Sequence, residues 1–242
     1  MKDSTKTYES RIEYFPDGTT RTTEDVSFAD GLETEGYSWD YITLHQRGRS
    51  SQDFSTFYTD TNPYITEIAD YIHENAPSSE FMFFENWSPY KDRIIEMYDA
   101  TDYRYDKVLD GYEEDEYYST LFGAIRNSYL TAAETIGNPN RVIPAGEAVY
   151  LAVEKYGFAE YVEDSDTTDD KFKSTARAMY RDTTSHLTYM GRILAGLVWY
   201  EYLTGNDVRE NPYQNTSYVS EADMALLKEI AHEACQMSYY NK

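Results

Sequence analysis

The sequence predicts one α/β domain of three layers, in which a parallel β-sheet lies between two layers of helices. Short apolar segments typical of strands alternate three times with longer segments whose apolar residues recur at helical spacing. The connections between successive strands are too long for hairpins, which favours parallel pairing through crossover helices. Neither an internal repeat nor a low-complexity linker divides residues 1–242, so we expect a single domain.

A polar hairpin is predicted near the N-terminus, as a surface excursion over residues 8–36. Two polar, β-like segments flank Pro16-Asp17-Gly18, where proline fixes φ and glycine accepts a positive φ. A short helical segment is expected to follow over residues 28–35, because Gly36 is placed to end it.

Three segments are expected to form the strands of the sheet: residues 39–46, 80–87 and 141–145. The first reads Trp-Asp-Tyr-Ile-Thr-Leu-His-Gln, and we expect it to be a core strand. The second is apolar nearly throughout, which is typical of a strand that helices cover on both faces.

Helices are expected between and after these strands. The first has clear ends, with Asn62 placed to cap it, Pro63 at its first position and Pro77 beyond its last turn. The final helix opens with a capping box formed by Ser220 and Asp223. Three further helices are predicted between them, over residues 115–136, 146–153 and 186–205.

Two acidic segments interrupt the pattern. Residues 89–118 are rich in tyrosine, and both a substrate-facing insertion or lid and a solvated loop fit them. Residues 160–173 lack the glycine turn and the terminal glutamate of a calcium loop. The four histidines show no ligand spacing, and His73 and His232 are expected to be ordinary helix residues. We therefore expect neither a metal nor an organic cofactor.

The composition restricts the partners. The formal net charge is −23, which argues against binding to nucleic acid or to an anionic membrane and is compatible with a neutral ligand such as a sugar. The sequence contains no run of eighteen apolar residues, which a membrane-spanning helix would need, and residues 1–6 lack the apolar core of a secretion signal. A soluble protein is therefore expected. The single cysteine, Cys235, is expected to be a buried, inert thiol. The 26 tyrosines fit recognition surfaces, and the alternative explanation is a bias in composition.

The chemistry of such folds is expected outside the carboxyl ends of the strands. Three loops should meet there, over residues 45–51, 85–90 and 144–147, joined by the turn that holds Asp182 and His186. An aspartate beside a histidine can orient the imidazole as a general base. The amide of Gln46 suits an oxyanion. Candidate substrate contacts are His45, Asn86 and Trp87. Each of these residues also has a structural alternative. The strand-end residues would only form hydrogen bonds to backbone groups, and the turn would be a helix N-terminus capped by Asp182 or Ser185, with His186 an ordinary surface residue.

Taken in order, these segments resemble a branch of the SGNH (GDSL-like) hydrolase superfamily that is described only as a domain of unknown function. The resemblance covers residues 8–235 and rests on the strand ending at Gln46, the strand ending Asn86-Trp87, Val142-Ile143-Pro144-Ala145-Gly146, and Arg181-Asp182 followed by His186-Leu187. It implies a flavodoxin-like three-layer fold and ester hydrolysis, often of acetyl groups on carbohydrate. It also implies His186 as base, Asp182 as its orienting partner and Gln46 as an amide donor to the oxyanion.

Two features depart from the family pattern. Its histidine usually follows the aspartate by three residues, whereas Asp182 and His186 are four apart. The strand that ends in a Gly-Asp-Ser or Gly-Asn-Ser turn and carries the nucleophile is also absent, so the nucleophile is unknown and the chain alone is expected to show little activity. Without that strand, the strand of residues 39–46 would have an open edge, through which a partner chain or a second copy could pair. Four serines are weak substitutes: Ser50, Ser51, Ser128 and Ser185.

The sequence thus supports a serine ester hydrolase acting on a small or carbohydrate ester. The alternatives are a catalytically inactive SGNH-like module that binds glycans, or a truncated fragment. In the binding module, aromatic side chains would form stacking surfaces, namely Trp87, Tyr90, Tyr98, Tyr103 and Tyr105.

Overall fold

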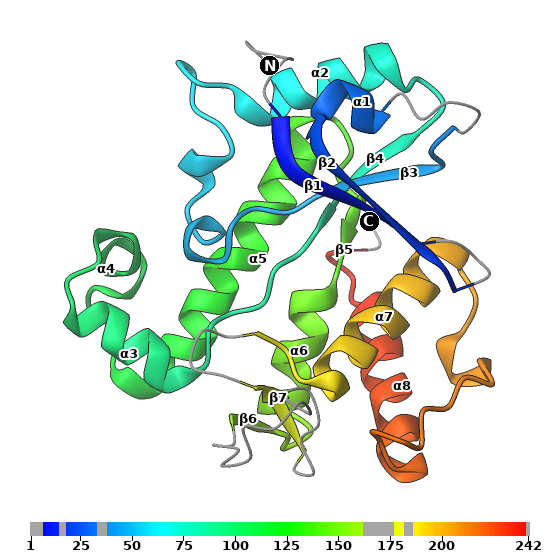
Figure 1. The fold of residues 1–242 in the computed structure, drawn as a ribbon. Helices are drawn as coiled ribbons and strands as arrows, with labels where there is room; N and C mark the ends of the chain where they lie inside the picture. The colour runs from blue at the N-terminus through cyan, green and yellow to red at the C-terminus, as the bar shows by residue number, and fades with distance from the viewer. Residues whose placement is uncertain (1–6, 15–17, 33–37, 162–176, 182–185, 241–242) are drawn as a thin grey trace.

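The computed structural model describes residues 7–14, 18–32, 38–161, 177–181 and 186–240 (Figure 1). Its centre is a small parallel sheet in the order β3-β4-β5. The strands are β3 (Tyr41–Leu44), β4 (Glu80–Phe84) and β5 (Val142–Ile143). Helices cover both faces of this sheet, which confirms the predicted three-layer α/β fold.

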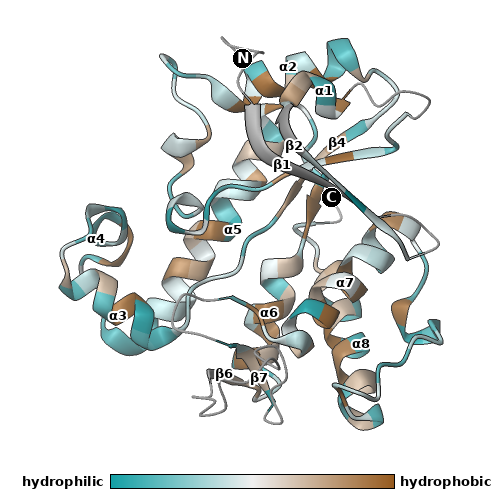
Figure 2. Cartoon of the chain, viewed as in Figure 1, coloured by the Kyte–Doolittle hydropathy of each residue, from teal (hydrophilic) through white to brown (hydrophobic). Residues whose placement is uncertain are grey.

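The middle strand divides the hydrophobic core in two. Successive side chains of a strand point to opposite faces, so Phe81 and Phe83 enter one cluster of buried residues and Met82 enters the other. The Phe81 side is covered by α2 (Tyr64–Asn75) and α5 (Tyr117–Thr135). The Met82 side is covered by α6 (Ala145–Glu154), α7 (Tyr189–Thr204) and α8 (Glu221–Gln236). In Figure 2 the strongest hydrophobic colour marks β5 and parts of α6, α7 and α8.

The predicted N-terminal hairpin is confirmed. Strands β1 (Thr7–Tyr14) and β2 (Thr20–Ser27) pair antiparallel, and α1 (Phe28–Leu32) follows directly. Asp30 accepts hydrogen bonds from the backbone N–H and hydroxyl of Ser27, which joins the strand to the helix.

Two expectations about the next elements were wrong. Strand β3 is not a fully buried core strand: its residues are partly exposed, with Tyr41 39% exposed, because it is an edge strand that pairs only with β4 among the described strands. Ile42 and Leu44 still pack against the core. Pairing of this edge with a partner chain stays a prediction. Asn62 does not cap α2, since Pro63 occupies the N-cap position and Asn62 instead closes a tight turn with Thr59.

Residues 89–118 are mostly helical, so the solvated-loop interpretation was wrong. They form α3 (Lys91–Asp99), α4 (Tyr103–Leu109) and the 3-10 turn η3 (Glu114–Glu116). Buried side chains from α3 and α4, including Ile94 and Tyr105, pack in the same cluster as α5. The apolar side chains of this acidic segment therefore pack it against α5 and the Phe81 face of the sheet.

A second pair of parallel strands was not predicted. Strands β6 (Ala159–Tyr161) and β7 (Ala178–Tyr180) pair after α6, and the acidic stretch between them lies outside the described residues. Helix α7 begins at Tyr189 and not at His186, because Thr188 is the N-cap and accepts a hydrogen bond from the Gly191 N–H at 3.1 Å.

The last helix has the predicted cap. Ser220 is its N-cap residue, and its hydroxyl accepts a hydrogen bond from the Asp223 N–H at 3.1 Å. Cys235 on this helix is buried, and burial raises the pKa of its thiol to about 12, which confirms the expectation of an inert cysteine. In the part of the chain that the structure describes, no helix is both long and apolar enough to span a bilayer.

Candidate functional site

The loops that follow β3 and β4 meet at the carboxyl ends of the strands, as predicted. The Asn86 side-chain amide donates to the main-chain carbonyl of Gln46 at 3.3 Å. The Gln46 N–H donates to the phenolic oxygen of Tyr129, a buried residue of α5, at 2.9 Å. Parallel strands end at one edge of their sheet, so these two loops form a continuous polar rim.

The loop after β5 joins the same rim through a close backbone approach. A Cβ atom at Gly146 would lie only 2.2 Å from the carbonyl oxygen of Asn86. Only glycine allows the first turn of α6 to come this near to the residue after β4. All three predicted loops therefore converge.

The side chain of Gln46 is directed into its own loop. Its amide nitrogen donates to the carbonyl oxygen and to the hydroxyl oxygen of Thr56, both at 3.1 Å, and its carbonyl oxygen accepts from the Arg47 N–H at 2.8 Å. In this arrangement the amide supports the loop. To stabilise an oxyanion it would have to exchange one of the bonds to Thr56.

His45 and Trp87 belong to one aromatic group at the end of β4. Both contact Phe84 edge-on, with ring centroids 6.0 Å away for His45 and 6.3 Å for Trp87. Trp199 of α7 packs on the same phenylalanine at 5.3 Å. His45 is exposed and Trp87 half-buried, so both are placed where a ligand at the strand ends could touch them.

His186 lies between β7 and α7, and its side chain is exposed. Its carbonyl oxygen accepts from the Arg181 N–H at 2.9 Å. The preceding residue of β7, Tyr180, donates its hydroxyl to the Ser88 carbonyl at 2.6 Å, which fastens this segment to the loop after β4. Asp182 lies outside the described residues, so its pairing with His186 stays a prediction.

The serines considered as nucleophiles are poorly placed where the structure describes them. Ser51 is fully buried, and its hydroxyl donates to the Gly48 carbonyl at 2.9 Å. Ser128 is buried within α5. Ser50 lies inside the 3-10 turn η1 (Gly48–Ser50), and Ser185 lies outside the described residues.

A buried ionisable cluster stands directly behind the rim, and the sequence did not reveal it. Glu85 has no exposed surface; its carboxyl accepts from the Glu147 N–H at 2.8 Å and from the Tyr240 hydroxyl at 2.7 Å. Glu147 is also buried and receives two hydrogen bonds from the Arg126 guanidinium, at 2.6 and 2.8 Å. The guanidinium in turn lies over the ring of Tyr239 at 4.9 Å.

Of the two carboxyl groups in this cluster, only one carries a negative charge at neutral pH. The fork from Arg126 marks Glu147 as the ionised member. Burial and the negative charge of Glu147 raise the pKa of Glu85 to about 8, so Glu85 carries its proton at neutral pH. In the sequence, Glu85 could have been noticed as a charged residue directly after the apolar run of β4. No sequence pattern pointed to Tyr240.

Comparison with known families gives the identity at the level of the whole chain. The model of a domain of unknown function, DUF4886, matches residues 2–234. The chain belongs to the DUF4886 family. No curated protein matches this DUF4886 chain.

A solved structure from the same family is similar to this DUF4886 chain. It is described as the crystal structure of a DUF4886 family protein from Bacteroides uniformis ATCC 8492. The two share 21% sequence identity with a TM-score of 0.68, over 93% of this chain and 72% of the other. At this identity the likeness shows a common fold.

Proposed function

We propose that this DUF4886 protein is a serine ester hydrolase of the SGNH (GDSL-like) type. The observation that carries the proposal is the convergence at the strand ends: Asn86 contacts Gln46, Gly146 closes on Asn86, and Tyr180 fastens the His186 segment to the same loop. Ligands of open parallel sheets bind at this edge. The bond from Tyr180 links the segment that carries the exposed His186 to the loop that contributes Asn86, which supports the proposal.

Each residue has a role in this scheme. His186 accepts the proton of a nucleophilic hydroxyl as that oxygen attacks the ester carbonyl carbon, and then returns the proton to the departing alcohol. Asp182 orients the imidazole. The Gln46 amide, released from Thr56, donates to the carbonyl oxygen as negative charge develops on it. Water then hydrolyses the acyl-enzyme by the same route, and the nucleophile itself is not assigned to a residue.

The substrate class follows from charge and surroundings. A chain with a net charge of −23 repels anionic ligands at long range. The exposed His45 and half-buried Trp87 offer aromatic surface beside the rim. An uncharged acylated molecule, such as an acetylated carbohydrate, fits both properties.

Substitution of His186 tests the proposal. In the protein produced from its complete reading frame, His186→Ala is expected to lower the hydrolysis of p-nitrophenyl acetate and of acetylated oligosaccharides by about 100-fold or more, because it removes the general base. The matched control is His73→Ala, since His73 is exposed on α2 and remote in sequence from the rim; it is expected to leave the rate unchanged. A wild-type rate no higher than that of His186→Ala contradicts the proposal.

A non-catalytic glycan-binding module is the second candidate, favoured by the buried state of Ser51 and Ser128. The aromatic surface available for stacking on a glycan is smaller than the sequence suggested. Tyr90 and Tyr105 are core residues, whereas Tyr103 is 66% exposed. In the assay above, binding to acetylated oligosaccharides without hydrolysis would favour this candidate.

A further inference from the structure

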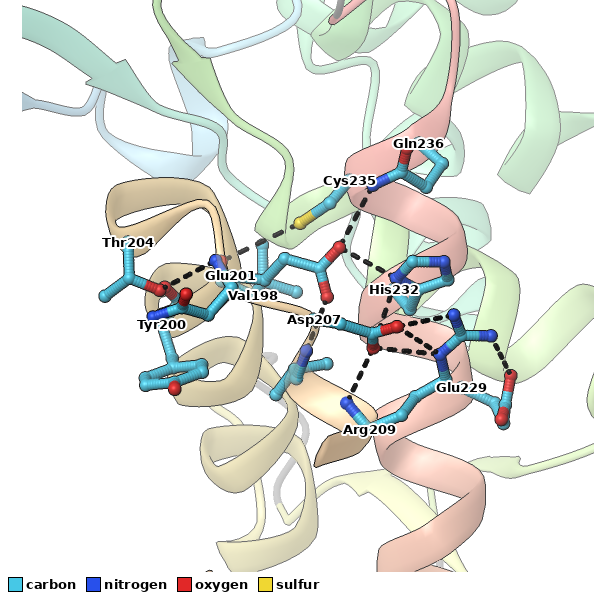
Figure 3. A network of polar contacts seen from close by, with 12 residues as sticks. Val198, Tyr200, Glu201, Thr204, Asp207, Arg209, Glu229, His232, Cys235 and Gln236 are labelled. Atoms are coloured by element: carbon cyan, nitrogen blue, oxygen red, sulfur yellow. Dashed lines mark hydrogen bonds and ion pairs between the residues drawn. The ribbon is translucent and has the colours of Figure 1, made fainter. Parts of the chain in front are cut away.

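A second group of ionisable side chains lies where the last turn of α7, the 3-10 turn η4 (Val208–Glu210) and α8 meet (Figure 3). The Nδ1 atom of His232 lies 2.8 Å from a carboxylate oxygen of Glu201 and 3.6 Å from one of Asp207. One potential ligand atom of each residue lies within 4.8 Å of the others. His232 is therefore not the ordinary helix residue expected from the sequence, because its ring faces two carboxylates from other elements.

We propose that Glu201, Asp207 and His232 bind one zinc ion. An imidazole nitrogen and carboxylate oxygens are common zinc ligands, with bonds of about 2.0–2.2 Å. Such bonds require ligand atoms roughly 3–4 Å apart, so the observed separations of 2.8 and 3.6 Å need only small shifts. The nitrogen ligand selects zinc over magnesium and calcium, which prefer oxygen ligands alone.

The charges of the surroundings suit a divalent cation. Glu201 is buried, and Asp207 forms an ion pair with Arg209, which also lies 3.6 Å from Glu229. With a neutral His232, the three carboxylates and one guanidinium carry a net charge of −2. In the protein without metal, the Nδ1–H tautomer of His232 donates to Glu201; when zinc binds at Nδ1 the ring proton moves to Nε2, so the imidazole stays neutral and the ion balances the charge.

The remaining contacts can persist when the metal binds, and they hold the ligands in place. The second carboxylate oxygen of Glu201 accepts from the Val208 N–H at 3.0 Å, and the Gln236 amide donates to the first at 3.1 Å. The Arg209 guanidinium donates to both carboxylate oxygens of Asp207, at 2.9 Å to one and 2.6 Å to the other. Hydrogen bonds of this kind orient metal ligands and tune their affinity.

The site is open to solvent on one side. Glu201 and Gln236 line a cavity of about 400 Å³ together with Gly205 and Tyr202. Asp207 and His232 do not line this cavity, but their side chains are themselves 34% and 23% exposed, which gives zinc a route of entry and room for a water molecule as its fourth ligand. Cys235 borders the same cavity, but its sulfur lies against the Val198 carbonyl at 3.8 Å and burial raises the pKa of the thiol to about 12. The thiol is therefore not included among the ligands.

Calorimetric titration of the chelator-treated protein with zinc chloride at neutral pH tests the proposal. We expect one zinc ion per chain, and a loss of affinity of roughly 10-fold or more in both His232→Gln and Asp207→Asn. Titration with calcium chloride is expected to show no binding at this site. Circular dichroism of each variant without metal shows whether the variant is folded. If His232→Gln does not fold, Asp207→Asn provides the test, because Asp207 lies at a partly exposed position.

The control separates this site from adventitious binding to surface histidines. His73→Gln changes an exposed histidine on α2 and is expected to bind zinc as the wild type does. Absence of stoichiometric zinc binding to the wild type overturns the proposal, and so does equal affinity in the folded His232→Gln or Asp207→Asn variant. Neither result depends on whether the protein hydrolyses esters.

Discussion

Raising the pH from about 5.5 to about 8.5 is expected to lower the free energy of unfolding by a few kcal/mol through Glu85 alone. Burial and the charge of Glu147 raise the pKa of Glu85 from 4.5 to about 8 in the folded chain. The folded state therefore keeps a proton that the unfolded state releases near pH 4.5. This stabilisation is complete below that value and is lost as the pH rises to about 8, at roughly 1.4 kcal/mol per pH unit.

Glu85→Gln is the variant that isolates this effect, because glutamine mimics the protonated acid. Urea unfolding at a series of pH values should show a smaller loss of stability for the variant than for the wild type. The neighbouring phenols and guanidinium do not titrate in this range, because burial raises the pKa of Tyr239 and of Tyr240 and Arg126 stays charged. Burial also raises the pKa of Glu147, a carboxyl that both proteins keep. Parallel curves for the two proteins would mean that Glu85 is ionised throughout.

Gly146→Ala is expected to destabilise the protein by about 3 kcal/mol or more. The new Cβ would lie 2.2 Å from the carbonyl oxygen and 2.9 Å from the carbonyl carbon of Asn86, and 3.0 Å from the carboxyl of Glu85. Two of these atoms are backbone, so no rotamer change relieves the clash. Either α6 or the loop after β4 must move, which also strains the hydrogen bond from the Glu147 N–H to Glu85.

Gly196→Ala is the matched control for this substitution. Gly196 is exposed within α7, and a Cβ there would meet no atom within 4 Å. Alanine is the better helix former, so the variant is expected to gain about 0.5–1 kcal/mol. Thermal unfolding should therefore move in opposite directions for the two substitutions, and equal shifts would contradict the close approach at Gly146.

The layers of the fold and the rim of the site were predictable because both follow from local patterns. The apolar run of β4 indicated a strand covered on both faces, and parallel strands bring their carboxyl ends to one edge, so Gln46 and Asn86 were expected to meet. The helices within residues 89–118 were not predicted, because tyrosine serves equally on a surface and in a core. Tyr103 is exposed, whereas Tyr105, two positions later, is buried.

The ionisable clusters were beyond the reach of sequence patterns for a different reason. Periodicity reports which face of one element is buried, but not which distant residue lies opposite. Glu85 and Glu147 are 62 positions apart, and Glu201 and His232 are 31 apart. Only the three-dimensional arrangement pairs them.

The position of Tyr240 has a consequence for how the protein is made. It lies 155 positions after Glu85 and 93 after Glu147, the two carboxyls that its hydroxyl contacts. During translation both acids and Arg126 leave the ribosome well before this tyrosine, and closing so long a loop is slow. The edge of the sheet that carries the rim therefore reaches its final hydrogen bonding only after residue 240 has been synthesised.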